Sequence, residues 1–166
     1  MKTLTLIRHA KSSWNNPSLT DFDRPLNKRG LRDAPAVGTA IEQAGISFDR
    51  VLCSDARRAR QTLSLLSHGV TVDDDVIEYR HDMYGASAHH LLSCIAEQAD
   101  SVSDIALVGH NPGMEDLANN LADEHIGAMS TCNVVQIEFD CDSWSDLSSA
   151  SATVAFIIRP GDLKLT

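Results

Sequence analysis

Three short apolar runs, each followed by an amphipathic helical pattern, constrain the fold of this chain more than any other feature. The runs cover residues 3–7, 48–54 and 104–110. Short apolar runs of this kind are typical of strands in a sheet that is covered on both faces. Because strand and helix alternate through most of the chain, the sequence predicts an α/β fold.

The helical patterns begin and end at recognisable signals. They cover residues 27–45, 54–68, 87–99 and 111–122. Pro35 is expected to bend the first helix, and Ser54 with Asp55 is a favourable start for the second. The intervening residues 70–75 are expected to form a brief strand before an irregular segment.

The last part of the chain has a different pattern. Two strand-like runs, residues 131–139 and 152–160, are separated by a polar segment with no helical pattern. They are expected to pair antiparallel. The predicted architecture is therefore a three-layer α/β sandwich with a mainly parallel central sheet and one antiparallel element. With 166 residues, the chain is expected to form a single domain, residues 1–166.

Composition limits the partners that the chain can have. Its formal net charge of −9 argues against nucleic acid as a target. No apolar run approaches the roughly 20 residues of a membrane-spanning helix. The four cysteines lack CxxC spacing, and the N-terminus lacks the apolar core of a signal peptide. These features predict a cytoplasmic protein with reduced thiols, which binds neither membrane nor nucleic acid.

Cationic and imidazole side chains follow all three of the first strands. The first strand is followed by Arg8 and His9, the second by the arginine-rich segment 54–62, and the third by Gly109 and His110. In a parallel sheet these strand ends meet at one edge, where ligands bind. Guanidinium groups match phosphate oxygens, and a neutral imidazole is a usable nucleophile. The pattern indicates attack by His9 on phosphorus, a phosphohistidine intermediate and its hydrolysis.

Four motifs in order resemble the histidine phosphatase superfamily, whose members are phosphoglycerate-mutase-like enzymes. The motifs are "RHA" at 8–10, "RPLNKRG" at 24–30, "SDARRARQT" at 54–62 and "VGHNPG" at 108–113. The short chain and the residues "RHAKSSW" at 8–14 are most similar to the small SixA-type phosphohistidine phosphatase branch. The resemblance implies the same α/β sandwich and a reaction that needs no metal or other cofactor.

The resemblance also implies roles for individual residues. His9 would be the phosphorylated nucleophile, and His110 would donate a hydrogen bond to a phosphoryl oxygen. Arg8, Arg58 and Arg24 would bind the phosphate. The neighbouring arginines of the second helix, Arg57 and Arg60, are then expected to be surface charges.

The general acid of larger relatives has no clear counterpart in this chain. The connection from residue 73 to 87 is too short for the inserted segment that carries it, although Glu78 or Asp82 could replace it. Loss of such an acid costs roughly two to four orders of magnitude where an alkoxide leaves, and less where an imidazole leaves. The expected substrate is therefore a phosphohistidine-bearing protein. The residues that recognise the leaving group are expected within 11–23 and 79–90, where the sequence contains no recognisable motif.

Other functions remain as alternatives. A small-molecule phosphomonoesterase of the same superfamily is the first. A phosphodiesterase that uses His9 and His110 as acid and base, or a non-catalytic module that binds phosphoproteins, is more remote. A metal site among His81, Asp82, His89 and His90 is not expected, because adjacent histidines on a helix point about 100° apart. The sequence does not predict the oligomeric state.

Overall fold

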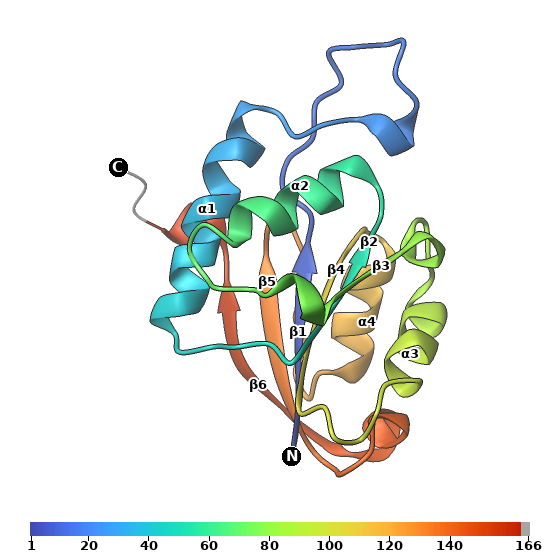
Figure 1. Ribbon diagram of the computed structural model, residues 1–166. Helices are drawn as coiled ribbons and strands as arrows, with labels where there is room; N and C mark the ends of the chain where they lie inside the picture. The colour runs from blue at the N-terminus through green and yellow to red at the C-terminus, as the bar shows by residue number, and fades with distance from the viewer. Residues whose placement is uncertain (164–166) are drawn as a thin grey trace.

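A six-stranded sheet forms the centre of the protein (Figure 1). The structure is a computed structural model and describes residues 1–163. The strands are β1 (Lys2–Arg8), β2 (Arg50–Ser54), β3 (Ile77–Arg80), β4 (Asp104–Gly109), β5 (Val134–Asp140) and β6 (Ser151–Ile158). The α-helices are α1 (Lys28–Gln43), α2 (Arg57–Leu66), α3 (Ala88–Ala96) and α4 (Gly113–Leu121).

The strands lie in the order β3-β2-β4-β1-β5-β6. The first four strands of this order are parallel, whereas β5 pairs antiparallel with both β1 and β6. The mainly parallel sheet with one antiparallel element is therefore confirmed. The β5–β6 connection contains a short 3-10 helix, Trp144–Ser149, whose tryptophan is fully buried in the core on one face of the sheet.

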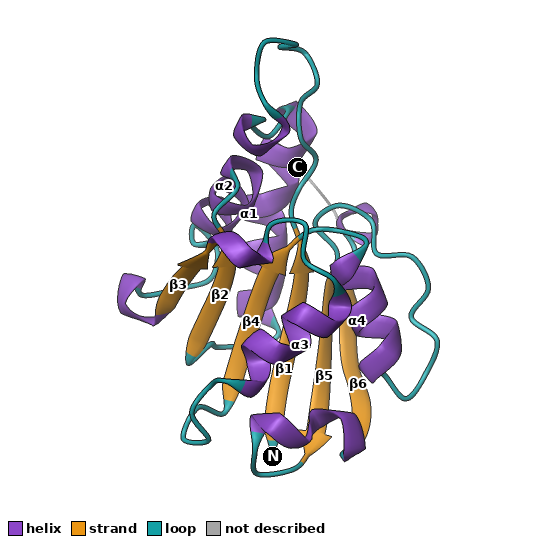
Figure 2. Ribbon diagram, turned by 90° about the vertical axis from the view of Figure 1, so that its right-hand side faces the viewer, coloured by secondary structure: helices purple, strands orange, loops and turns teal. Residues whose placement is uncertain are grey.

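Helices cover both faces of the sheet, which confirms the three-layer sandwich. Helices α3 and α4 pack on one face, in a core that includes Leu4 and Leu107. Helices α1 and α2 pack on the other face, in a core that includes Ile7 and Val108. Figure 2 shows α3 and α4 in front of the sheet. The alternation of residues along each strand explains why the odd and even positions belong to different cores.

Two sequence predictions about local structure are wrong. Residues 70–75 do not form a strand; the edge strand is β3, Ile77–Arg80, after a 3-10 turn at Asp74–Val76. The aspartates of this turn are exposed, whereas Ile77 pairs with Val51 of β2. The second correction concerns Ser54, which ends β2 instead of starting α2.

None of the helices within residues 1–163 combines the length and the apolar character that are needed to cross a membrane.

Candidate active site

The carboxyl ends of β1 and β2 lie on either side of β4, at one edge of the sheet. The register pairs Arg8 with Gly109, so His9 and His110 leave adjacent strands at the same level. Their ring centroids lie 5.1 Å apart. Ser54, the last residue of β2, contacts the second of these rings. Sheet topology alone thus brings together residues that are about a hundred positions apart in the chain.

The hydrogen bonds of the His9 ring leave one of its nitrogens unprotonated. Nδ1 lies 2.7 Å from the carbonyl oxygen of Ala10, and because a carbonyl can only accept, Nδ1 carries the proton. Nε2 therefore keeps its lone pair, and Nε of Arg58 donates to it weakly at 3.4 Å. The backbone is fixed independently, because the N–H of His9 donates to Gly109 and its carbonyl accepts from Cys132.

Burial first, and then the charges of His110, Arg58 and Arg8, lower the pKa of His9 to about 3. A hydrogen bond to the carbonyl of Ala10 opposes this shift only in part. The imidazole is therefore neutral at neutral pH, which is the protonation state that a nitrogen nucleophile needs.

This pKa predicts how the stability of the protein depends on pH. Between the folded value of about 3 and the ordinary value of 6.5, the unfolded chain binds more protons than the folded chain. The free energy of unfolding should therefore rise with pH across this window. His9→Gln changes the free energy of unfolding, and this change should be about 1 to 2 kcal/mol more stabilising near pH 5 than near pH 8.

Thermal unfolding of both proteins at the two pH values measures this difference. His68→Gln is the control, because the side chain of His68 is exposed at the end of α2. If the effect of His9→Gln were the same at both pH values, the pKa of His9 would not be depressed in the folded chain.

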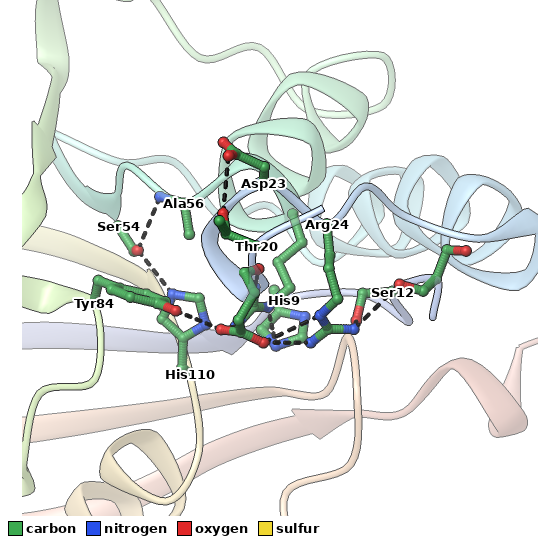
Figure 3. Close-up of polar contacts among 12 residues, drawn as sticks. His9, Ser12, Thr20, Asp23, Arg24, Ser54, Ala56, Tyr84 and His110 are labelled. Atoms are coloured by element: carbon green, nitrogen blue, oxygen red, sulfur yellow. Dashed lines mark hydrogen bonds and ion pairs between the residues drawn. The ribbon is translucent and has the colours of Figure 1, made fainter. Parts of the chain in front are cut away.

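His110 offers a hydrogen-bond donor beside this nucleophile. Its Nε2 lies 2.7 Å from the hydroxyl oxygen of Ser54, and that oxygen also accepts from the N–H of Ala56. The other ring nitrogen, Nδ1, is buried and has no partner within the described chain, so in the tautomer that carries its proton there it can donate to a ligand. Burial lowers the pKa of His110 to about 4. Figure 3 shows this ring between Ser54, His9 and the phenol of Tyr84.

Arg58 is the buried member of the arginine cluster at the start of α2. The side chains of Arg57 and Arg60 are exposed, as the resemblance implies. The hydroxyl of Thr62 accepts from the N–H of Ala10 at 3.0 Å and donates to the carbonyl of Arg58 at 2.7 Å. The threonine of the "SDARRARQT" motif therefore joins α2 to the residue that follows His9.

The "RPLNKRG" motif is held in place by similar contacts. The side-chain oxygen of Gln61, on α2, accepts from the N–H of Leu26 at 2.8 Å. Asn27 caps α1 by accepting from the N–H of Gly30. A Cβ on Gly30 would lie 2.2 Å from the carbonyl oxygen of Lys11, so only glycine fits against this loop. These contacts position Arg24 next to the site.

Arg8 enters the site from the end of β1. Its NH1 donates to the carbonyl of Met129 at 3.0 Å, and Asn111 donates to the same oxygen. The carboxylate of Glu115 accepts from the N–H of Met129, which fixes this loop. Nε of Arg8 is buried and has no partner within the described chain. Buried polar atoms without a partner are rare, and within the described chain two nitrogens of this site, Nε of Arg8 and Nδ1 of His110, have none.

Arg24 is also buried, and its guanidinium contacts Ser12, the carbonyl of Ser13, Trp14 and Asp21. NH1 donates to the hydroxyl of Ser12 at 2.7 Å, and the charged group stacks on the ring of Trp14, 3.5 Å from its centroid. Nε and NH2 contact the carboxylate of Asp21. That carboxylate also binds Arg58, so one acidic group connects the two guanidiniums.

Three site residues escaped the sequence analysis: Asp21, Ser54 and Tyr84. Asp21 and Tyr84 lie within the segments 11–23 and 79–90, which the sequence associates with the leaving group, but neither lies in a motif. Tyr84 donates a hydrogen bond to the carboxylate of Asp21. The one available signal was the spacing of Asp21 and Arg24, an acidic and a basic residue three positions apart.

Glu78 is not brought to this site. It lies on β3, and its carboxylate pairs with Arg50 at 2.9 Å and Arg80 at 3.6 Å. Asp82 pairs with Arg80 as well, at 2.9 Å. The two acidic residues considered from the sequence are thus members of an ion-pair network at the edge of the sheet.

A cluster outside this site brings together Asp82, His90 and Cys94, whose potential ligand atoms lie within 4.8 Å of one another. His90 contacts the carboxylate at 2.9 Å. The guanidinium of Arg80 binds both oxygens of the same carboxylate and lowers its pKa. Because a cation already occupies this carboxylate, we assign the cluster to the ion-pair network.

Comparisons with known proteins identify the family of this chain. A family model described as the histidine phosphatase superfamily (branch 1) matches residues 4–86. A chloroplastic protein of Arabidopsis thaliana, itself uncharacterised, is 33% identical over 174 residues, covering 99% of this chain and 75% of that protein.

Two solved structures are similar over nearly the whole chain. A candidate phosphohistidine phosphatase SixA from Agrobacterium tumefaciens has a TM-score of 0.82 and 28% identity, over 96% of this chain and 98% of that one. A candidate phosphohistidine phosphatase SixA from Nakamurella multipartitia has a TM-score of 0.80 and 28% identity, over 96% of each chain. With its four motifs, its fold and these relatives, the chain belongs to the histidine phosphatase superfamily and is of the SixA type.

Proposed function

We propose that the chain is a phosphatase in which His9 takes up a phosphoryl group. Nε2 of His9 forms a bond to phosphorus while the bond to the leaving group breaks and its electron pair goes to the leaving atom. Water then attacks phosphorus, the bond to Nε2 breaks, and inorganic phosphate and a proton are released. The observation that carries this proposal is the geometry of the His9 ring: the Ala10 carbonyl accepts from Nδ1–H, which leaves Nε2 unprotonated, 3.4 Å from Nε of Arg58.

The remaining groups of the site have roles in phosphoryl binding. Arg8, Arg24 and Arg58 supply the positive charge that stabilises a phosphoryl group during transfer, so the reaction needs no metal. The Nδ1–H of His110 donates to a phosphoryl oxygen. The unpaired nitrogens of Arg8 and His110 support this assignment, because a phosphoryl group would give both of them an acceptor.

We propose a protein-borne phosphohistidine as the substrate. A leaving imidazole needs less help from an acid than an alkoxide does, and among residues 1–163 the acidic side chains considered for this role are not placed to supply one. Glu78 and Asp82 are engaged with arginines, and hydrogen bonds from Tyr84 and then the arginines lower the pKa of Asp21 to about 2. The similar SixA structures carry the same substrate class in their names.

A substrate panel tests the proposed function. The panel compares a histidine phosphotransfer protein phosphorylated on histidine with alkyl phosphates such as phosphoserine, in the presence of a chelator. The value of kcat/KM for the phosphohistidine protein should exceed that for alkyl phosphates by about two to four orders of magnitude, the cost of a missing general acid. Equal or better turnover of alkyl phosphates would favour the small-molecule phosphomonoesterase instead.

A further inference from the structure

Within residues 1–163, Asp21 presents the one carboxylate that contacts the proposed phosphate-binding arginines Arg24 and Arg58. Arg58 NH2 lies 3.1 Å from its Oδ2, and Arg24 Nε and NH2 lie 3.1 Å and 3.0 Å from its Oδ1. The hydroxyl of Tyr84 donates a hydrogen bond to Oδ2. An anion among phosphate ligands opposes phosphate binding by charge alone, so its presence calls for a role.

The guanidinium of Arg58 shows on which side of the phosphoryl group this carboxylate lies. Its Nε faces Nε2 of His9, whereas NH1 and NH2 contact the backbone oxygen and the carboxylate of Asp21. Asp21 therefore lies at the end of the guanidinium that is farther from the nucleophile. The side chain of Asp21 is 46% exposed, whereas His9 is 7% exposed, so this end is the mouth of the site.

In-line displacement places the leaving group opposite the nucleophile. An atom that leaves from phosphorus as His9 attacks would therefore depart toward the mouth, where Asp21 lies. A carboxylate at this position repels a departing alkoxide. It attracts a group that carries an N–H donor or a positive charge.

We infer that Asp21 is a specificity-determining residue that accepts a hydrogen bond from the N–H of the leaving imidazole, an inference that rests on the proposed function. In phosphohistidine one ring nitrogen carries phosphorus, and the other can carry a proton. When Nε2 of His9 attacks, the substrate P–N bond breaks and its electron pair stays on the ring nitrogen. The ring leaves as neutral imidazole with its N–H intact, so Asp21 gives up no proton.

Three observations agree with this role. The pKa of Asp21 is lowered to about 2, first by the hydrogen bond from Tyr84 and then by Arg58 and Arg24, so the group is an acceptor at neutral pH. Its two oxygens are held by three side chains, which fixes their direction. The guanidinium of Arg58 has five N–H donors, and Asp21 accepts from only two of them, so further donors remain for a phosphoryl group.

The test compares Asp21→Asn with the unchanged protein on two substrates, phosphoimidazole and p-nitrophenyl phosphate. Asparagine keeps the size of the side chain but removes the charge. The ratio of kcat/KM for phosphoimidazole to that for p-nitrophenyl phosphate should fall roughly 10- to 100-fold, the value of one charge-assisted hydrogen bond. Asp23→Asn is the matched control, because Asp23 lies in the same 3-10 helix and is exposed, and its carboxylate accepts from the hydroxyl of Thr20 alone among the described side chains.

A substrate variant keeps the inference testable if the asparagine variant folds poorly. Phosphoimidazole methylated on its second nitrogen has no N–H. For the unchanged protein, the rate of hydrolysis relative to the spontaneous rate should therefore be lower with this substrate than with phosphoimidazole. In Asp21→Asn the same methyl group should cause no further loss of this relative rate. If the asparagine variant lost equal activity on both substrates, Asp21 would only hold the arginines. If the unchanged protein hydrolysed neither substrate, the proposed function itself would fail.

Discussion

Replacing His9 by alanine is expected to lower kcat/KM on a phosphohistidine protein by about 10⁴-fold or more, because the atom that forms the covalent bond is removed. The protein should still fold. Among the described residues the side chain of His9 bonds to the neighbouring Ala10 and, weakly, to Arg58, and the backbone bonds to Gly109 and Cys132 do not depend on it. The melting temperature at neutral pH should change by no more than about 5 °C.

His68→Ala is the control for this variant, since it removes an exposed imidazole from the same protein. It should keep full turnover. Steady-state kinetics with thermal unfolding of both variants measures the two quantities together. Full activity of folded His9→Ala would remove this residue as the nucleophile.

Replacing Arg58 by alanine is the second large effect that we expect, a loss of about a thousandfold in kcat/KM. The guanidinium of Arg58 donates to Nε2 of His9, and its buried position leaves little water to replace its charge. The loss should occur mainly in kcat, because charge on the transferring phosphoryl group is stabilised most in the transition state.

The neighbouring arginines of α2 provide matched controls for this effect. Arg60→Ala removes a guanidinium from the same helix, but from a side chain that is exposed over the ring of Tyr79. It should lower turnover by less than about threefold, since exposed charges act weakly through solvent. If both variants lost equal activity, a general reduction of positive charge would explain the result, and the assigned role of Arg58 would be wrong.

The positions of His9 and His110 could be predicted because they depend on strand order and register. Apolar runs identify β1 and β4, and parallel strands place their ends at one edge. The pairing of Arg8 with Gly109 then fixes the two histidines at one level. This part of the site follows from periodicity and from the general geometry of parallel sheets.

Asp21 and Tyr84 could not be predicted in the same way, because contacts between loops determine their positions. Asp21 lies in a 3-10 helix of three residues, and its carboxylate is directed by Arg24, Arg58 and Tyr84. Such contacts connect segments that are up to 63 residues apart, and no local pattern records them.

Ser54 shows how tertiary contacts can override a correct local rule. A serine before a helix is a favourable N-cap, and the sequence predicts that role for it. In the structure Ala56 is the cap residue of α2, and the hydroxyl of Ser54 contacts His110 at 2.7 Å. The same side chain could serve a helix or an imidazole, and only the fold decides between them.

The most direct test of the central claim is to capture the covalent intermediate. The protein is mixed with a phosphohistidine protein, quenched within milliseconds in denaturant at alkaline pH, where phosphorus–nitrogen bonds survive, and digested for mass spectrometry. Phosphate should be found on His9, linked through Nε2, and should be absent from His9→Ala treated in the same way. Turnover that continues with no phosphate on His9 at any time point would contradict the account.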